Sequence, residues 1–361
     1  MQPLSTTLPN TQFEAALSAA EEADASPEER AEMLMEIAMG MQARPKSAQQ
    51  LADAVSLYER ALDMAPTQAV LLRARIVARM GTALQALPEN TADSGTDNLA
   101  RALECFQTAI QTLQVHAKPE EVAELELNQG LVMQALAGLG RGRIADAISA
   151  YQRSLRTFSR EAWPQEYSVL HNNLAIAYLS MPVSDERGRM REALAVQSFE
   201  EVLKVINLID HPSEYAMIHN NLGNALQCAT SSHVLENNLR ALAAYDEALR
   251  VRNPRDTPLE YANTIANKAN VLRNLVPDPA HAAIAHATAR AIADVTTDAI
   301  TKPMPDMPAD PLSESLALLR EAHELFQHHG DAHKAALMRD AAAEIETELA
   351  AKTAQRRRRL D

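Results

Sequence analysis

The sequence predicts an all-α protein built from repeated pairs of helices. Ala, Leu, Glu and Arg dominate the composition, with only 10 glycines and 4% aromatic residues. Ala and straight-chain residues favour helices because they lose little rotamer freedom there. The alternating runs of β-branched and aromatic residues that are typical of strands do not occur. The third observation is that segments from different parts of the chain align with one another, which indicates an internal repeat.

A ten-residue motif carries the internal alignment. The segment Glu166 to Ala175 returns as Glu214 to Gly223, and a weaker copy begins at Glu260. The small residue of the motif recurs as Gly40, Gly81, Gly130, Ala175, Gly223 and Ala269. A second series has an aromatic residue followed three positions later by a usually small one: Tyr58/Ala61, Phe106/Ala109, Tyr151/Ser154, Phe199/Val202 and Tyr245/Ala248. Two series with nearly the same spacing indicate a repeat array.

A third series marks where the repeats begin. A proline is followed two residues later by a glutamate at Pro27, Pro119, Pro164, Pro212 and Pro258. Proline suits the first helical turn, and the glutamate there meets the positive end of the helix dipole. Ser26 and Thr257 are predicted to complete capping boxes with Glu29 and Glu260.

Each repeat is therefore predicted to consist of two helices. Helix A begins at the proline and contains the small residue, and helix B carries the aromatic residue. The small residue is predicted to make room for an aromatic ring of a neighbouring helix B. A single two-helix repeat could not bury both of its apolar faces by itself, so the repeats must stack on one another.

The segments Asn221-Leu222-Gly223-Asn224-Ala225-Leu226 and Ala243-Ala244-Tyr245-Asp246-Glu247-Ala248-Leu249 resemble the tetratricopeptide repeat (TPR) family. The usual repeat has about 34 residues, and these longer units look most like the extended-helix repeats of kinesin light chains. The resemblance covers residues 27 to 275. It implies a TPR solenoid, a right-handed α-α superhelix of about six helix pairs plus terminal capping helices. It also implies a non-catalytic scaffold that binds a protein or an extended peptide in a concave groove.

Four regions are predicted along the chain. Residues 1–26 form an N-terminal segment with a short helix from Thr11 to Glu22, and residues 27–299 form the repeat array, including a helix from Ala280 to Val295. Residues 300–311 form a proline-rich linker. Residues 312–361 form a capping helical hairpin, broken at Gly330, and a basic tail.

Composition and charge exclude several functions. The net charge of −14 disfavours nucleic-acid binding because an acidic surface repels phosphates. Cys105 and Cys228 have no metal-like spacing and are predicted to be small buried residues in a reducing compartment. The sequence shows no signal peptide and no apolar run of roughly 18 residues, which predicts a cytoplasmic protein without a membrane partner.

The sequence offers little material for catalysis. It contains no phosphate-binding glycine loop, nucleophile elbow or Cys/His cluster. His323 and His328 are five positions apart, whereas the helical zinc motif needs four. We therefore predict no enzyme, no metal site and no cofactor.

The candidate binding residues are polar side chains opposite the packing stripe of helix A. Leu222, Gly223 and Leu226 form that stripe in one repeat. Across three successive repeats the opposite side presents Asn172, Asn173, Asn220, Asn221, Asn224, Gln227, Asn267, Asn270, Arg273 and Asn274. Asparagine offers donors and an acceptor without charge, so a row of them can pair with the amides of an extended peptide. Alternatively, these side chains cap loops or bond to the next repeat, as buried polar groups must.

Three functions stay open at this point. The favoured one is a peptide- or protein-binding scaffold. The others are a dedicated chaperone for the assembly or maturation of an enzyme subunit and a structural oligomerisation module that uses residues 312–351 or an uncapped end of the solenoid. TPR proteins that grip the acidic C-termini of heat-shock chaperones use Lys and Arg beside Asn at these positions, but the matching positions of the three central repeats hold Leu, Ile, Ala and Asn, with Arg273 as the only base. That activity is disfavoured.

Overall fold

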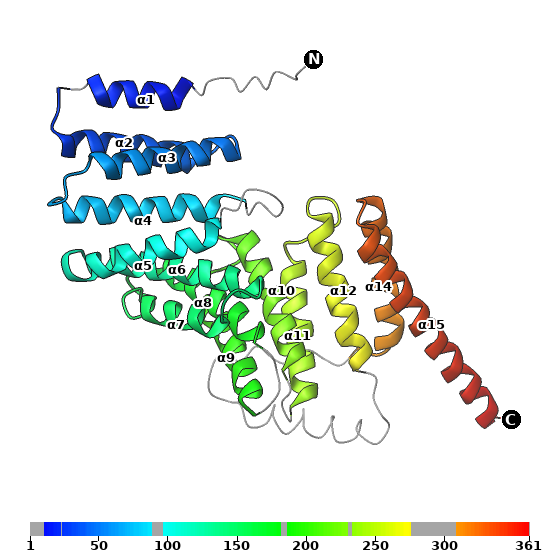
Figure 1. Ribbon diagram of the computed structural model, residues 1–361. Helices are drawn as coiled ribbons and strands as arrows, with labels where there is room; N and C mark the ends of the chain where they lie inside the picture. Colours follow the sequence, from blue (N-terminus) through cyan, green and yellow to red (C-terminus); the bar gives the residue numbers. More distant parts are fainter. Residues whose placement is uncertain are drawn as a thin grey trace, which may run out of the picture. The chain divides into compact units, whose positions relative to one another are not determined.

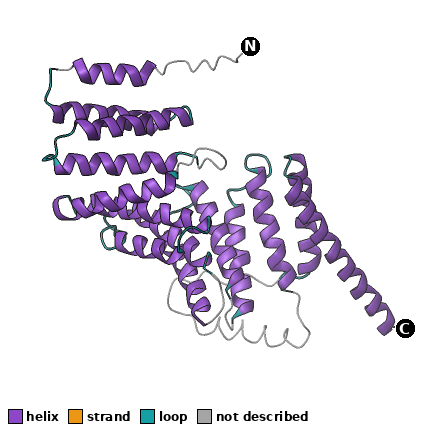
Figure 2. Ribbon diagram, in the orientation of Figure 1, coloured by secondary structure: helices purple, strands orange, loops and turns teal. Residues whose placement is uncertain are grey.

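The computed structural model describes residues 11–22, 24–88, 97–181, 186–229, 233–275 and 308–360. Within these ranges every regular element is an α-helix (Figure 2), so the predicted all-α fold class is confirmed. The predicted helix Ala280–Val295 and residues 300–307 of the predicted linker lie outside the described residues. The chain divides into two compact units, Met1–Asn173 and Leu174–Asp361.

The helices follow one another along the chain, and those that are adjacent in sequence are labelled in order in Figure 1. Unit 1 contains α1 (Thr11–Glu22), α2 (Pro27–Ala43), α3 (Ala48–Met64), α4 (Val70–Ala86), α5 (Asn98–His116), α6 (Pro119–Gly138) and α7 (Ile144–Ser154). The boundary between the units falls within α8 (Pro164–Leu179). Unit 2 contains α9 (Glu186–Val202), α10 (Pro212–Cys228), α11 (Val234–Leu249), α12 (Pro258–Asn274), α14 (Pro311–His328) and α15 (Ala332–Leu360).

The helices pack in successive pairs, as predicted. In unit 1, α2 packs on α3, α4 on α5 and α6 on α7. In unit 2, α10 packs on α11 and α12 on α14. The A helices are thus α2, α4, α6, α8, α10 and α12, and α14 serves as the B helix of α12. The predicted domain boundaries stay a prediction.

One side-chain contact supports the assignment of α14 as a B helix. Tyr215 on α10 donates its hydroxyl to Glu247 Oε2 on α11 at 2.7 Å. Tyr261, at the matching place on α12, donates to Glu321 Oε1 on α14 at 3.0 Å. The same A-to-B bond therefore recurs, although residues 275–310 separate α12 from α14 in the sequence. α14 also packs on α15, and Gly330, with φ of +81°, lies between them at the predicted helix break.

The prediction that small residues make room for aromatic rings is confirmed at three glycines. A Cβ atom added to Gly81, Gly130 or Gly223 would lie 3.0, 2.5 or 2.6 Å from ring carbon Cε1 of Phe106, Tyr151 or Tyr245, respectively. All three rings are fully buried.

The assignment of Gly40 to this series is wrong, because nothing lies within 4 Å of its Cβ position. Ala38, fully buried, takes that place in α2. Two residues correspond to about 200° around a helix, which turns Gly40 to the exposed side.

The predicted proline starts of five helices are confirmed, since α2, α6, α8, α10 and α12 each begin at the proline. Ser26 forms the predicted capping box with Glu29, whose carboxylate accepts a 2.8 Å bond from Ser26 N. The capping box predicted at Thr257 is wrong. Thr257 has φ −135° and ψ 56°, away from the extended conformation of Ser26, and its Oγ1 accepts from Asn253 N at 3.1 Å.

Two asparagines build the turns that lead into α10 and α12. Asn207 Oδ1 accepts from the amides of Ile209 and Asp210 at 3.0 and 2.9 Å. Asn253 repeats these bonds with Arg255 and Asp256 at the same distances. The side chain thus replaces backbone partners in the turn, and the recurrence fixes the connection from helix B to the next helix A.

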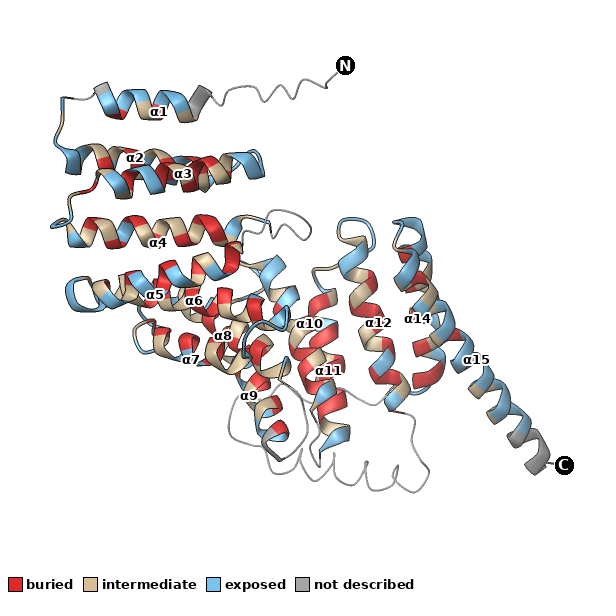
Figure 3. Cartoon of the chain, in the orientation of Figure 1, coloured by how far each residue is buried: buried red, intermediate tan, exposed pale blue. Residues whose placement is uncertain are grey.

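Each unit has its own apolar core, and the buried residues lie along the facing sides of the paired helices (Figure 3). Cys105 is buried as predicted, and burial raises the pKa of its thiol to about 11. The prediction of a buried Cys228 is wrong: it is the last residue of α10 and is exposed. No described helix has both the length and the apolar character that a membrane crossing needs.

Candidate functional site

The predicted polar row lies on A helices. Asn220, Asn221, Asn224 and Gln227 belong to α10, and Asn267, Asn270, Arg273 and Asn274 belong to α12. These two A helices of adjacent pairs contact each other within unit 2. Asn172 and Asn173 lie on α8, at the end of unit 1, and both are half-buried. The role of all these residues in binding stays a prediction.

Three of the asparagines meet where α10 and α12 adjoin. Asn267 Nδ2 donates to Asn220 Oδ1 at 3.3 Å, and Asn220 Nδ2 donates to Asn221 Oδ1 at 3.4 Å. Asn220 is 9% exposed, whereas the other two are half-buried. Both bonds are long for N–H···O geometry and are therefore weak. Asn220 is therefore buried and links the two helices.

Asn224 and Gln227 share a partner from helix B of the same pair. The buried Tyr245 donates its hydroxyl to Asn224 Oδ1 at 2.7 Å, and Gln227 Oε1 lies 3.4 Å from the same hydroxyl oxygen. Both carboxamide residues are half-buried. The side-chain oxygens of Asn224 and Gln227 thus face the interface between α10 and α11.

The asparagine side chains near the C-terminal end of α12 are more exposed to solvent than the carboxamides of α10. Asn270 and Asn274 are exposed. Arg273, between them, forms an ion pair of 2.9 Å with Glu344 on α15.

Pairing of a tyrosine hydroxyl with a carboxamide recurs in unit 1. Tyr58 donates to Gln42 Oε1 at 2.8 Å, and Tyr151 donates to Gln134 Oε1 at 3.0 Å. Burial raises the pKa of Tyr58, Tyr151 and Tyr245, so each hydroxyl stays protonated and able to donate near neutral pH.

Sequence reasoning missed these tyrosine–carboxamide pairs, although a signal for them exists. In each repeat with a helix B tyrosine, a glutamine stands four residues after the small residue of helix A. The three sets are Ala38 with Gln42, Gly130 with Gln134, and Gly223 with Gln227. Residues four apart share one face of a helix, so a ring that covers the first residue brings its hydroxyl near the second. In the third set, however, the Tyr245 hydroxyl makes its shorter bond to Asn224 and lies 3.4 Å from Gln227.

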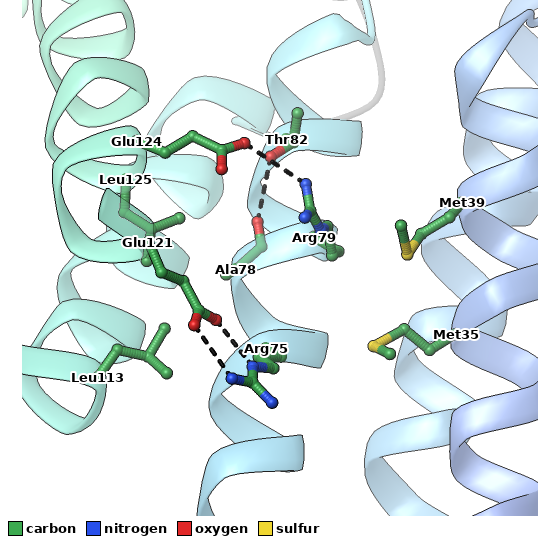
Figure 4. Close-up of a pocket in the computed structure, with 10 residues that line it drawn as sticks. All are labelled: Met35, Met39, Arg75, Ala78, Arg79, Thr82, Leu113, Glu121, Glu124 and Leu125. Carbon is green, nitrogen blue, oxygen red and sulfur yellow. Dashed lines mark hydrogen bonds and ion pairs between the residues drawn. The ribbon is translucent and has the colours of Figure 1, made fainter. Parts of the chain in front are cut away.

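A pocket of about 200 Å³ opens on the A helices of unit 1. Figure 4 shows α4 in the middle, the thioethers of Met35 and Met39 on one side and the carboxylates of Glu121 and Glu124 on the other. Met39 is 36% exposed. One wall of the pocket is therefore formed by flexible apolar methionine side chains and the opposite wall by charged side chains.

The charges of this pocket neutralise one another. Arg75 donates from Nε to Glu121 Oε1 at 2.8 Å and from a second nitrogen to Oε2 at 3.0 Å (Figure 4). Arg79 lies 3.6 Å from Glu124. The hydrogen bond from Arg75 outweighs partial burial and lowers the pKa of Glu121. With two acids facing two bases, the pocket presents no excess charge, and we assign it no ligand.

The described residues contain no group of three or more His, Cys, Asp or Glu side chains placed to hold a metal ion. His323, singled out in the sequence, contacts the backbone instead: its Nδ1 lies 2.8 Å from Ala335 O, which ties α14 to α15.

Comparisons with known proteins give a fold likeness only. No family model matches the sequence. No curated protein matches it either. Among solved structures, the apo form of RapI is 11% identical, with 94% of this chain and 97% of that chain covered and a TM-score of 0.42. A Rap protein complexed with Competence and Sporulation Factor is 10% identical, with 94% and 98% covered and a TM-score of 0.32.

Proposed function

We propose that this chain is a non-catalytic scaffold that binds an extended segment of another polypeptide along the A-helix face of α10 and α12. The observation that carries the proposal is the collection of neutral carboxamides on that face. Asn220, Asn221, Asn224 and Gln227 on α10 adjoin Asn267, Asn270 and Asn274 on α12.

Carboxamides suit a polypeptide main chain. Each offers two N–H donors and one oxygen acceptor, and an extended peptide offers the complementary groups at every residue. Asn270 and Asn274 are exposed, and Asn221 is only half-buried, so a partner can reach them without displacing the core. Neutral groups also avoid the large cost of desolvating an ion.

The test needs a probe whose chemistry is known. A display library of short unstructured peptides is selected on the full chain, and the tightest peptide is titrated calorimetrically. The double substitution Asn221→Ala and Asn270→Ala should weaken its binding by about 1–3 kcal/mol, from roughly 0.5–1.5 kcal/mol for each neutral hydrogen bond. The thermal midpoint should hardly move, because Asn270 is exposed and Asn221 accepts a single long bond from the described residues.

A matched control removes a carboxamide from the B-helix side of unit 2. Gln197 on α9 is exposed, and Gln197→Ala should leave peptide affinity unchanged. A library without any binder would contradict recognition of extended peptides. Unchanged affinity in the double variant would instead exclude these asparagines. A concentration-dependent mass without peptide binding would favour the oligomerisation module.

A further inference from the structure

The tyrosine hydroxyls bond to the oxygen of each carboxamide, and these bonds set which half of the carboxamide faces outward. A carboxamide is planar, with its oxygen and its NH₂ group on opposite sides of one carbon. In Asn224 the oxygen accepts the 2.7 Å bond from Tyr245. The NH₂ group is therefore directed away from the buried hydroxyl. Among the described residues it has no protein acceptor, and it keeps contact with solvent.

The two outward orientations of a carboxamide are not equivalent. If its oxygen faced outward, Asn224 would accept from peptide N–H groups. With the NH₂ group outward it can only donate. The same orientation holds in unit 1, where Tyr58 and Tyr151 occupy the oxygens of Gln42 and Gln134.

We propose that Tyr245 is a positioning residue that holds the Asn224 amide with its NH₂ group outward, so that this face selects main-chain carbonyl oxygens of the bound segment. The inference rests on the proposed function and specifies the polarity of its recognition. Carboxylates are the less suitable acceptors, because a chain of net charge −14 repels them.

The decisive variant is Asn224→Asp. A carboxylate still accepts the Tyr245 hydroxyl but cannot donate to a peptide carbonyl, and it repels that oxygen. With the peptide selected on the wild-type chain, Asn224→Asp should weaken binding by about tenfold or more, and Asn224→Ala by about two- to tenfold. Affinity in Asn224→Asp equal to the wild type would overturn the donor assignment while leaving the proposed function intact.

The second variant separates positioning from packing. Tyr245→Phe keeps the ring over Gly223, and the fold accepts phenylalanine at this repeat position, as Phe106 over Gly81 demonstrates. Freed from the hydroxyl, the Asn224 amide can rotate, so affinity should fall by about threefold. The side-chain amide signal of Asn224 in selectively ¹⁵N-asparagine-labelled protein should change its shift or broaden.

Tyr151→Phe is the matched control, because it removes the equivalent hydroxyl from unit 1. It should leave both peptide affinity and the Asn224 signal unchanged. If Tyr245→Phe altered neither affinity nor the Asn224 amide signal, the positioning role would be wrong. A wild-type chain that binds no library peptide would remove the proposed function itself, and this inference with it.

Discussion

The ring of Tyr245 packs over Gly223 while its hydroxyl reaches Asn224, so one side chain joins the packing of a repeat to the chemistry of its surface. The repeats differ in whether they carry this hydroxyl. Tyr58, Tyr151 and Tyr245 have it, and Phe106 and Phe199 do not. In the repeat of Phe106 the consequence is visible: Gln85, four residues after Gly81, has a buried Oε1 without a partner among the described residues.

Phe106→Tyr should therefore stabilise the protein. The new hydroxyl would take the place that the Tyr151 hydroxyl holds beside Gln134, and it would satisfy Gln85 Oε1. We expect the free energy of unfolding to rise by about 0.5–1.5 kcal/mol, measured by urea denaturation followed by circular dichroism.

Phe199→Tyr is the opposite case. The residue at the matching place on α8 is Leu179, which packs against the core of unit 2 and cannot accept a hydrogen bond. A hydroxyl buried there without a partner should cost about 1–3 kcal/mol. Stabilisation by both substitutions, or by neither, would contradict the pairing between tyrosine and carboxamide.

At the scale of single residues, the sequence predicts packing better than hydrogen bonding. The fit of Gly223 against Tyr245 follows from two series with nearly the same spacing. The carboxamide oxygen that accepts the tyrosine hydroxyl depends on how the side chains of two neighbouring helices lie relative to each other. A helical wheel describes one helix only and cannot show this. The same limit explains Asn220: a helical wheel places it on the open side of α10, but it bonds with Asn267 of the next helix A.

At the scale of elements, local signals predicted local structure. The prediction that five helices begin at a proline is confirmed, because the proline and the following glutamate act within a single helical turn. The pairing of α12 with α14 could not be read in the same way, because residues 275–310 separate the two helices. The capping box at Thr257 failed because the side chain of Asn253 already orders the preceding turn.

Contacts between successive A helices give a prediction about acid. Glu121 on α6 binds Arg75 on α4 through two hydrogen bonds, and the bond from Arg75 lowers the pKa of Glu121 below its ordinary value of 4.5. A carboxylate with a lowered folded-state pKa stabilises the protein above its unfolded-state pKa, and this contribution is lost as the pH falls through the folded-state pKa.

Glu121→Gln should thus cost at most about 1 kcal/mol near neutral pH, since Arg75 is half exposed. The difference from the wild type should shrink steadily below pH 4.5, as urea denaturation over a pH series would measure. Glu124→Gln is the control, because Glu124 is 54% exposed and lies 3.6 Å from Arg79. A difference for Glu121→Gln that does not vary with pH would mean that the ion pair contributes nothing.

At the scale of the whole molecule, each pair of helices buries its apolar side only against its neighbours, so the last pair needs a cover. In unit 2 that cover is α15. Ala335 joins an apolar cluster with Phe326, and Ile345 joins a second with Leu319. Lys334 Nζ also donates to Asn263 Oδ1 on α12 at 3.1 Å, and Arg320 donates to Glu346 at 2.6 Å.

A chain that ends at Asp331 should lose this cover and self-associate. Without α15, the apolar side chains of α14 would face water, and contiguous apolar patches favour association. We expect size-exclusion chromatography with light scattering to give a mass that rises with concentration, together with increased binding of an apolar dye. A chain that ends at Lys352 keeps Ala335, Ala342 and Ile345, so its mass should match that of the full chain. If the shorter chain kept the same mass and bound no more dye, α15 would not be the cap.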